Sequence, residues 1–265
     1  MRTYRKSNIF LSLVFLLLAG CSKEPQMERF SASECGRSSV TLRFECETPH
    51  EAVSRAANEN AVRDINLWAC GTDVGRNVHL YLPGGKTAAA LTLIPDNYRF
   101  YAVANAGRDL GEMAEAALQT LAAPFSGEPG DGAALPMAAR GELRVSGATS
   151  LTLRLRRLVS KLSLSLSVAP ALQSALTIES VQLLSVPDRC LYFTDNRAAD
   201  LSQRTDYPVQ GVSGTSFSRT YYLPENMAGV NASVASERQK DKAHAPSGAT
   251  WLRIKGRHND RPCTY

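Results

Sequence analysis

The chain has 265 residues and a formal net charge of +5, from 30 Lys and Arg against 25 Asp and Glu. Three of the surplus positive charges lie in the first 20 residues, which contain no acid, so the rest of the chain carries only +2. A charge so close to zero gives no electrostatic basis for binding nucleic acid. The roughly 245 remaining residues are enough for one large or two small domains. They contain no apolar run of about 20 residues, so we expect no membrane-spanning helix among them.

The first 21 residues have the order of an export signal. Residues 1–6 are basic, residues 9–18 are almost wholly apolar, and small residues then precede Cys21. The apolar stretch is only about ten residues, too short to span a bilayer of about 30 Å. Small residues followed by cysteine predict a lipoprotein signal peptide over residues 1–20 and a diacylglyceryl group on the thiol of Cys21. Acyl chains contribute about 0.8 kcal/mol per buried CH₂, so two or three of them would hold the protein on a membrane.

The exported chain begins with a polar stretch, residues 21–36, which predicts a tether. Over residues 40–46 four apolar side chains alternate with polar ones. They are Val40, Leu42, Phe44 and Cys46. A period of two with β-branched and aromatic residues predicts a strand with one buried face. Residues 47–61 fit either a weak helix or an exposed connection.

Further alternating runs, ended by Gly, Pro or Asn, predict strands at residues 63–70, 78–82, 87–93 and 98–105. Apolar residues at helical spacing over residues 110–121 predict one helix, which Asp109 would cap and Pro124 would stop. Residues 126–134 are rich in Gly and Pro and predict a loop.

The second half continues in the same style, with predicted strands at residues 141–145, 151–158, 161–168, 176–186, 191–193, 220–223 and 250–255. The clearest is 161–168, where leucines and serines alternate strictly. Residues 195–218 and 229–248 are polar and predict loops. Short strands at this spacing with one helix predict an all-β fold of sandwich type, with a boundary near residues 155–160.

Side chains capable of chemistry are scattered along the sequence. The four histidines lie far apart, and the five cysteines after Cys21 form no C-x-x-C pair. This predicts neither a disulfide framework nor a zinc site, although a Cys35–Cys46 bridge stays open for an oxidising compartment. No nucleophile elbow, zinc-protease motif or phosphate-binding loop is present in the sequence. We therefore expect no enzyme, no metal and no cofactor.

Several phrases of the sequence resemble the fimbrillin family, the lipoprotein precursors of type V pili and their anchor and tip relatives. The clearest are VRDINL, within residues 58–67, and YAVANAG, within residues 97–107. Others follow in the family's order at residues 135–137, 157–162, 222–227 and 249–252. Together they cover most of the chain after the signal peptide.

This resemblance implies two transthyretin-like β-sandwich domains, over residues 37–157 and 158–265, with the one short helix in the first. The chain stops soon after its last matched phrase, which indicates either a truncated product or a short variant. If it is truncated, the second sandwich is expected to be incomplete. The polar tail over residues 256–265 does not resemble a donor strand.

In such pilins an Arg-specific protease cuts away the first strand of the lipidated precursor, and the groove left behind accepts a strand from the next subunit. The resemblance implies that residues 40–46 form the exchangeable strand, with Val40, Leu42, Phe44 and Cys46 filling the groove. Arg55 follows this strand in a connection of small residues, which is a preferred setting for cleavage. Two alternatives are open: a permanent core strand, and an anchor subunit that keeps its lipid and is never cut.

The sequence thus predicts a lipid-anchored structural subunit of a surface pilus, held at the outer membrane through Cys21 and contributing to adhesion. Its partners would be other pilus subunits, joined by strand exchange. The alternative is a non-polymerising surface lipoprotein that binds carbohydrate or protein through its loops. Clustered exposed tryptophans would favour that alternative, but Trp68 and Trp251 both fall in predicted strands.

Overall fold

The computed structural model of the chain describes residues 36–47, 59–73, 75–125, 128, 133–197, 203–239 and 241–265. The signal peptide, Cys21, Cys35 and Arg55 lie outside these ranges, so what was expected of them stays a prediction. None of the helices in the described part of the chain has the length and hydrophobicity that crossing a bilayer requires.

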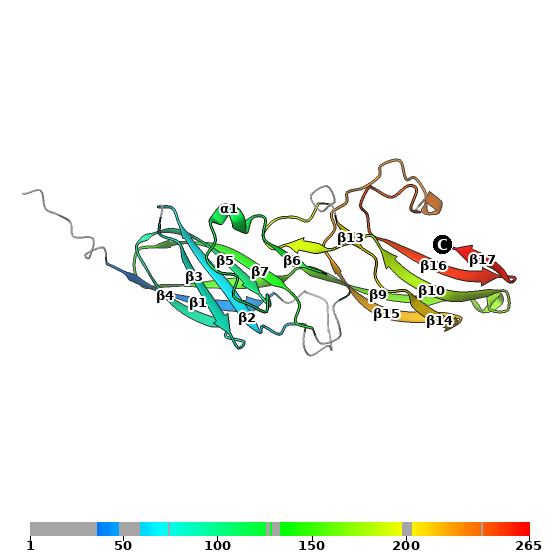
Figure 1. Cartoon of the computed structure of the whole chain (residues 1–265), viewed down its shortest axis with the longest axis horizontal. Coiled ribbons are helices and arrows are strands. Elements are labelled where there is room, and N and C mark those ends of the chain that lie inside the picture. Colours follow the sequence, from blue (N-terminus) through cyan, green and yellow to red (C-terminus); the bar gives the residue numbers. More distant parts are fainter. Residues whose placement is uncertain are drawn as a thin grey trace, which may run out of the picture. The chain divides into compact units, whose positions relative to one another are not determined.

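Seven strands of the first half belong to one hydrogen-bonded sheet. They are β1 Ser38–Cys46, β2 Asp64–Gly71, β3 Val78–Pro83, β4 Ala88–Leu93, β5 Asp96–Ala104, β7 Met137–Val145 and β8 Thr149–Arg157. The order in the sheet is β3-β2-β5-β7-β8-β1-β4. Figure 1 labels all of these strands except β8. β7 and β8 pair at only two positions, Met137 with Arg157 and Ala138 with Arg156. The sheet folds over at this short seam, which places β3-β2-β5-β7 in one layer and β8-β1-β4 in the other.

The two layers enclose one apolar core to which all seven strands contribute. Ile65, Leu67 and Ala69 of β2 face this core, as their alternation predicts. The other face of β2 is buried as well, because Trp68 and Cys70 belong to a second cluster on the outer side of the same layer. A strand buried on both faces lies inside the fold rather than at its surface.

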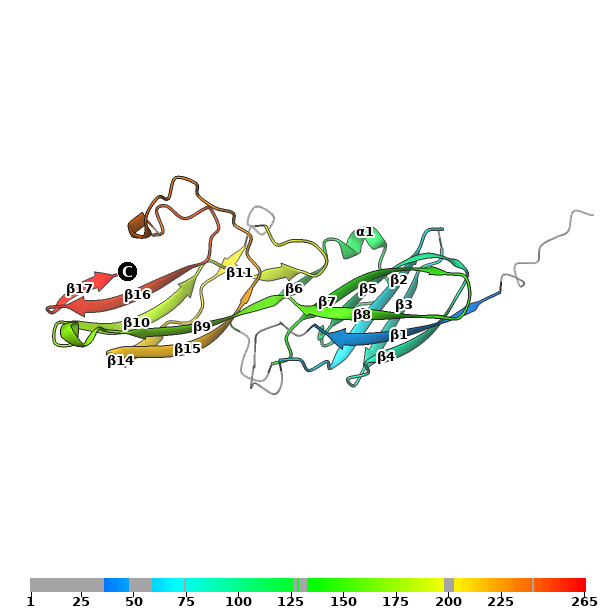
Figure 2. The ribbon, with the colours of Figure 1, turned by 180° about the vertical axis from the view of Figure 1, so that it is seen from behind.

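The second half is also a pair of layers. Its main elements are β9 Val159–Ser167, the 3₁₀ turn η1 Pro170–Leu172, β10 Leu176–Leu184, β14 Gln210–Gly214, β15 Ser216–Pro224, the 3₁₀ turn η2 Glu237–Gln239, β16 Trp251–His258 and β17 Arg261–Thr264. One layer is the sheet β14-β10-β16-β17, and the other is the antiparallel pair β9 and β15 (Figure 2). The leucines of β9 pack against apolar side chains of β10 and β16. The strand predicted from the alternation of leucine and serine is therefore confirmed.

A short ribbon crosses the predicted boundary between the two halves. β6 Ala122–Pro124 pairs antiparallel with β12 Arg189–Leu191, and the small strands β11 Val186–Pro187 and β13 Arg204–Thr205 pair with each other. Cys190, Tyr192 and Phe193 join Trp68 and Tyr101 in the outer cluster on β2 and β5. The second half therefore supplies part of the cover of the first, and the boundary near residues 155–160 stays a prediction.

The predicted helix over residues 110–121 is wrong for most of its length. The helix α1 runs only over Glu115–Leu118, and no side chain caps it. Gly111 has a φ of +77°, a conformation that an α-helix cannot contain and that glycine adopts readily. The carboxylate of Asp109 accepts a hydrogen bond from the Gly111 N–H at 2.8 Å instead of capping a helix. Pro124, expected to stop the helix, ends β6.

The predicted loop over residues 195–218 is also wrong in part, because β13, β14 and the start of β15 lie in it. These strands are short or rich in serine and glycine, which hides their alternation. Tyr207 of this stretch is fully buried in the core under β9, and Val212 and Phe217 also pack there. The strand predicted at residues 220–223 extends to nine residues as β15, and β17 of the polar tail pairs with β16.

Gly256 offers a test of how tightly the second sandwich is packed. It lies opposite a register shift in β10, and a Cβ added there would come within 2.1 Å of the Thr177 carbonyl oxygen. Gly256→Ala should lower the free energy of unfolding in urea by about 1–3 kcal/mol, because the backbone must move to admit the methyl group. Gly211→Ala in β14, where a Cβ would meet nothing within 4 Å, is the matched control. Equal unfolding midpoints for the two variants would contradict this packing.

Candidate functional site: the first strand and its groove

β1 lies between two strands and is hydrogen-bonded on both edges. It runs parallel to β8, from Val40 opposite Thr149 to Cys46 opposite Leu155. On its other edge it runs antiparallel to β4, from Ser38 opposite Leu93 to Arg43 opposite Ala88. The two neighbours are far from β1 in sequence order, and Figure 2 shows β8, β1 and β4 side by side.

Every second side chain of β1 points into the core. Val40 and Leu42 are fully buried and Phe44 is 4% exposed, whereas the residues between them are exposed. Burying an aliphatic or aromatic side chain of this size contributes about 1.5–3 kcal/mol. The strand is therefore confirmed, with the inward face that the sequence predicts, and its alternate apolar side chains fill the core.

β4 depends on β1 for its place in the sheet. Among the described strands, β1 is the only neighbour of β4, and β8 is held to β7 at only two positions. Without β1, facing edges of β4 and β8 would both carry unpaired N–H and C=O groups above an apolar groove. Such an edge readily accepts another strand.

Cys46 closes the end of the strand. Its Sγ donates a weak hydrogen bond to the Asn60 carbonyl at 3.3 Å and lies 3.8 Å from the Met137 sulfur. Burial raises the pKa of the Cys46 thiol, and the positive charge of Arg157 offsets part of that rise. The thiol is free and stays protonated at neutral pH, so it serves in packing rather than as a nucleophile.

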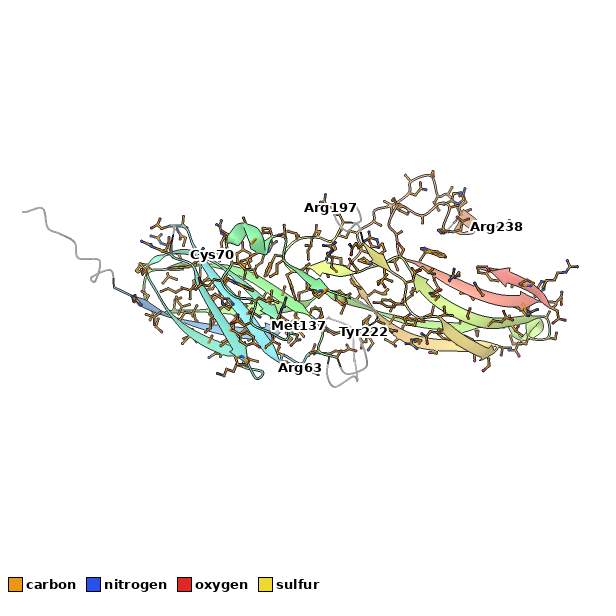
Figure 3. The ribbon with its side chains drawn as sticks, viewed as in Figure 1. Arg63, Cys70, Met137, Arg197, Tyr222 and Arg238 are labelled. Carbon is orange, nitrogen blue, oxygen red and sulfur yellow. The ribbon has the colours of Figure 1, made fainter. Side chains whose placement is uncertain are left out.

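After the connection that follows β1, the buried carboxylate of Glu59 holds the chain in place. Glu59 is 6% exposed, and its two oxygens lie 3.0 Å from Arg157 Nη1 and 2.7 Å from Lys161 Nζ. The Tyr222 hydroxyl donates to the same carboxylate at 2.6 Å. We call these four residues the Glu59 cluster; Tyr222 is labelled in Figure 3. The Glu59 cluster joins the segment before β2 to the end of β8, to β9 and to β15.

Arg63, just before β2, is held by its backbone. Its N–H donates to Asn105 Oδ1 at 2.8 Å, and its carbonyl accepts the Gly85 N–H at 2.8 Å. The Asn105 amide also donates to the carbonyls of Ala61 and Leu135. Asn105 can do this because it adopts a φ of +65°, which asparagine tolerates better than most residues. A chain held in this way resists the extension that a protease requires.

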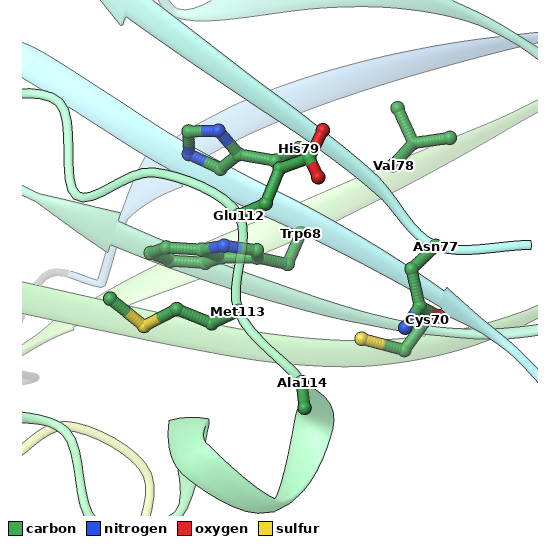
Figure 4. Close-up of a pocket in the computed structure, with 8 residues that line it drawn as sticks. All are labelled: Trp68, Cys70, Asn77, Val78, His79, Glu112, Met113 and Ala114. Carbon is green, nitrogen blue, oxygen red and sulfur yellow. The ribbon is translucent and has the colours of Figure 1, made fainter. Parts of the chain in front are cut away.

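A small pocket of about 290 Å³ lies on the outer face of β2 and β3, lined by Trp68, Cys70, Asn77, Val78, His79, Glu112, Met113 and Ala114 (Figure 4). Trp68 is only 2% exposed, its ring centroid lies 5.0 Å from that of His79, and its indole N–H donates to the Gly111 carbonyl. Burial raises the pKa of Cys70 to about 11, and the Glu115 carboxylate adds to the rise. With its ring enclosed, Trp68 offers no platform for stacking a sugar.

In the described ranges no group of three or more His, Cys, Asp or Glu side chains is placed to hold a metal ion.

Comparison with solved structures identifies the fold. A candidate cell adhesion protein from Bacteroides eggerthii is 15% identical, with a TM-score of 0.59 over 86% of this chain and 77% of that one. The tip fimbrial protein Mfa3 from Porphyromonas gingivalis, solved with a C-terminal truncation, is 12% identical, with a TM-score of 0.52 over 86% and 80%. The fimbrilin FimA from the same species is 13% identical, with a TM-score of 0.52 over 84% and 72%. The chain has the fimbrillin fold.

Comparison by sequence matches less of the chain than comparison by structure. A family described as a domain of unknown function (DUF4906) matches residues 221–265. No curated protein sequence matches the chain. The resemblance found in short phrases is thus confirmed at the level of the fold, as an all-β protein of several sheets with one short α-helix in its described part.

The structure brings together residues whose link the sequence did not reveal. The sequence indicated Val40, Leu42, Phe44 and Cys46 by their alternation. Glu59 gave no such signal, since its partners are about 100 residues or more away and an isolated Glu before a strand is usually exposed.

Leu42 is the central plug of β1 and should dominate the stability of the first sandwich. Leu42→Ala should lower the free energy of unfolding in urea by about 2–5 kcal/mol, the usual range for a fully buried leucine. Thr41→Ala, on the exposed face of the same strand, should change it by less than about 0.5 kcal/mol. If both variants unfold at the same urea concentration, β1 does not fill the core.

Proposed function

We propose that this protein is a lipid-anchored structural subunit of a surface pilus, which assembles by exchange of β1 after export. The observation that carries the proposal is the position of β1, paired on both edges and plugged into the core by alternate side chains. The fold it shares with fimbrial proteins supports the same role.

The physical argument for exchange starts from the groove. Removal of β1 exposes two strand edges and the sites of Val40, Leu42 and Phe44. A strand donated by another subunit would restore the backbone hydrogen bonds, and its alternate side chains would refill the apolar sites. Since the folded subunit is unstable with an open groove, removal of β1 would make association with a donor favourable.

The proposed processing site is Arg55, in the sequence that connects β1 to β2. Two neighbouring arginines are poorer candidates. Arg43 lies within β1, where the backbone is paired on both sides. Arg63 is held by Asn105 and Gly85, directly before β2. Cleavage at Arg55 would release β1 and leave the Glu59 cluster attached to the body of the subunit.

Membrane attachment is proposed through acyl chains on Cys21. A stable anchor requires more than one chain, which lipidation of an N-terminal cysteine supplies. A subunit that keeps this lipid and is never cut would act as an anchor at the outer membrane rather than as a repeating unit of the fibre.

Cleavage after Arg55 is testable in a host that supplies an Arg-specific protease. The wild-type chain should yield a mature N-terminus at Ala56 and ladders that resist SDS, whereas Arg55→Ala should keep an acylated Cys21 and give no ladder. Mass spectrometry of the N-terminus and SDS gels of outer-membrane fractions measure the two effects. Arg43→Ala, exposed on β1, should behave as wild type.

The same preparation tests exchange itself. A synthetic peptide of residues 36–47 added during assembly should occupy open grooves and shorten the ladder. The peptide with Leu42→Asp should leave it unchanged, because a charge cannot enter the apolar site. A ladder of full length in Arg55→Ala, or one insensitive to both peptides, would refute assembly by exchange of β1.

The Glu59 cluster should keep the protease away from Arg63. Removing one partner of a buried ion pair costs about 3–5 kcal/mol, so Glu59→Gln should open the segment before β2. Limited trypsin digestion should then give an additional N-terminus at Asp64, at least about tenfold more abundant than in wild type. Glu179→Gln breaks the exposed pair with Arg257 and is the control that should not change the fragments. Identical fragments from Glu59→Gln and wild type would show that the cluster gives no protection.

A further inference from the structure

A wide, open pocket lies where the second half covers the first. Its volume is about 750 Å³, and three arginines from separate elements line it: Arg140 of β7, Arg189 of β12, and Arg197, which follows β12. Arg197 is labelled in Figure 3. Asp195 is the one carboxylate in the lining.

The positive charges of this pocket are poorly compensated. The side chains of Arg140 and Arg197 make no ion pair or hydrogen bond with other described residues. Arg189 Nε lies 3.5 Å from Asp188 Oδ1, yet both atoms are buried without a hydrogen-bond partner. Like charges gathered on one surface repel one another, so the arrangement costs energy unless an anion is bound.

Backbone pairing fixes where the main chain of each of these arginines lies. Arg140 stands opposite Tyr101 in the β5–β7 ladder, two residues beyond Ala138 and on the same outer face. Arg189 stands opposite Pro124 in the β6–β12 ribbon, and Arg197 forms a β-bridge with Met227. All three arginines therefore extend from paired main chain into the same pocket.

The rest of the lining suits a hydroxylated ligand. Thr120 and Thr194 donate their hydroxyl hydrogens to backbone carbonyls, which leaves their oxygens free to accept. Leu191 and Phe193 give the pocket an apolar base. Guanidinium groups bind carboxylate and sulfate through two parallel hydrogen bonds.

We propose that this arginine pocket binds an acidic glycan, a chain of sugars bearing carboxylate or sulfate groups. The anionic groups would pair with the three arginines, and sugar hydroxyls would donate to the threonine oxygens. An acidic peptide satisfies the arginines but has few hydroxyls to offer, so the glycan is the better match. The pocket is separate from the groove of β1, and its role does not depend on assembly.

Calorimetric titration of the full chain at physiological salt tests the pocket, with oligogalacturonate and dextran sulfate as the carboxylated and sulfated probes. Binding of at least one of them is expected, and neutral dextran should not bind. Arg140→Ala and Arg197→Ala should each weaken binding by about tenfold or more, as expected for loss of a charged hydrogen bond. Arg140→Lys keeps the positive charge but not the two parallel hydrogen bonds of a guanidinium, so it should weaken binding less than Arg140→Ala does.

Arg144→Ala is the matched control, because Arg144 is exposed on the same strand and does not line the pocket. Its affinity should stay within twofold of wild type, and unfolding curves should show that all variants are folded. The proposal is overturned if neither acidic glycan binds, if Arg144→Ala weakens binding as much as Arg140→Ala, or if neutral dextran binds equally. Tighter binding of poly-glutamate than of either glycan would also overturn it, in favour of an acidic protein segment.

Discussion

The first sandwich depends on one strand being hydrogen-bonded along both edges at once. β1 joins β4 to the rest of the sheet, and its inward side chains occupy the middle of the main core. β4 has no other neighbour among the described strands. Loss of β1 would therefore remove its buried side chains from the core and also the hydrogen bonds that hold β4 in the sheet. The first sandwich therefore concentrates much of its cohesion in β1.

The Glu59 cluster balances this dependence. The proposed processing site lies in the sequence between β1 and β2, and directly after that connection a buried carboxylate holds the chain to Arg157, Lys161 and Tyr222. A separation of strands on one side would therefore not spread to the other. The strand proposed to exchange and the firmly held segment before β2 thus lie on either side of one connection in the sequence.

Sequence reasoning succeeded where a short-range pattern decides the structure. The alternation at residues 40–46 and 161–168 gave the right strands and the right inward faces. It failed at residues 110–121, because the positive φ of Gly111 outweighs helical spacing, and at β14 and β15, because serines and glycines hide the alternation. The parallel pairing of β1 with β8, the partners of Glu59 and the meeting of three arginines join residues far apart in the chain. No local signal reports such contacts, so only the three-dimensional structure reveals them.

The ribbon of β6 and β12 has a practical consequence for work on isolated halves. The outer cluster holds Trp68 and Tyr101 from the first half against Tyr192 and Phe193 from the second. A recombinant fragment that stopped at Arg157 would lack Phe193, whose ring lies 5.0 Å from that of Tyr101, and would expose part of the apolar outer cluster. Contiguous exposed apolar surface promotes aggregation. Insolubility of such a fragment would reflect a lost covering and would say nothing against the integrity of the first sandwich.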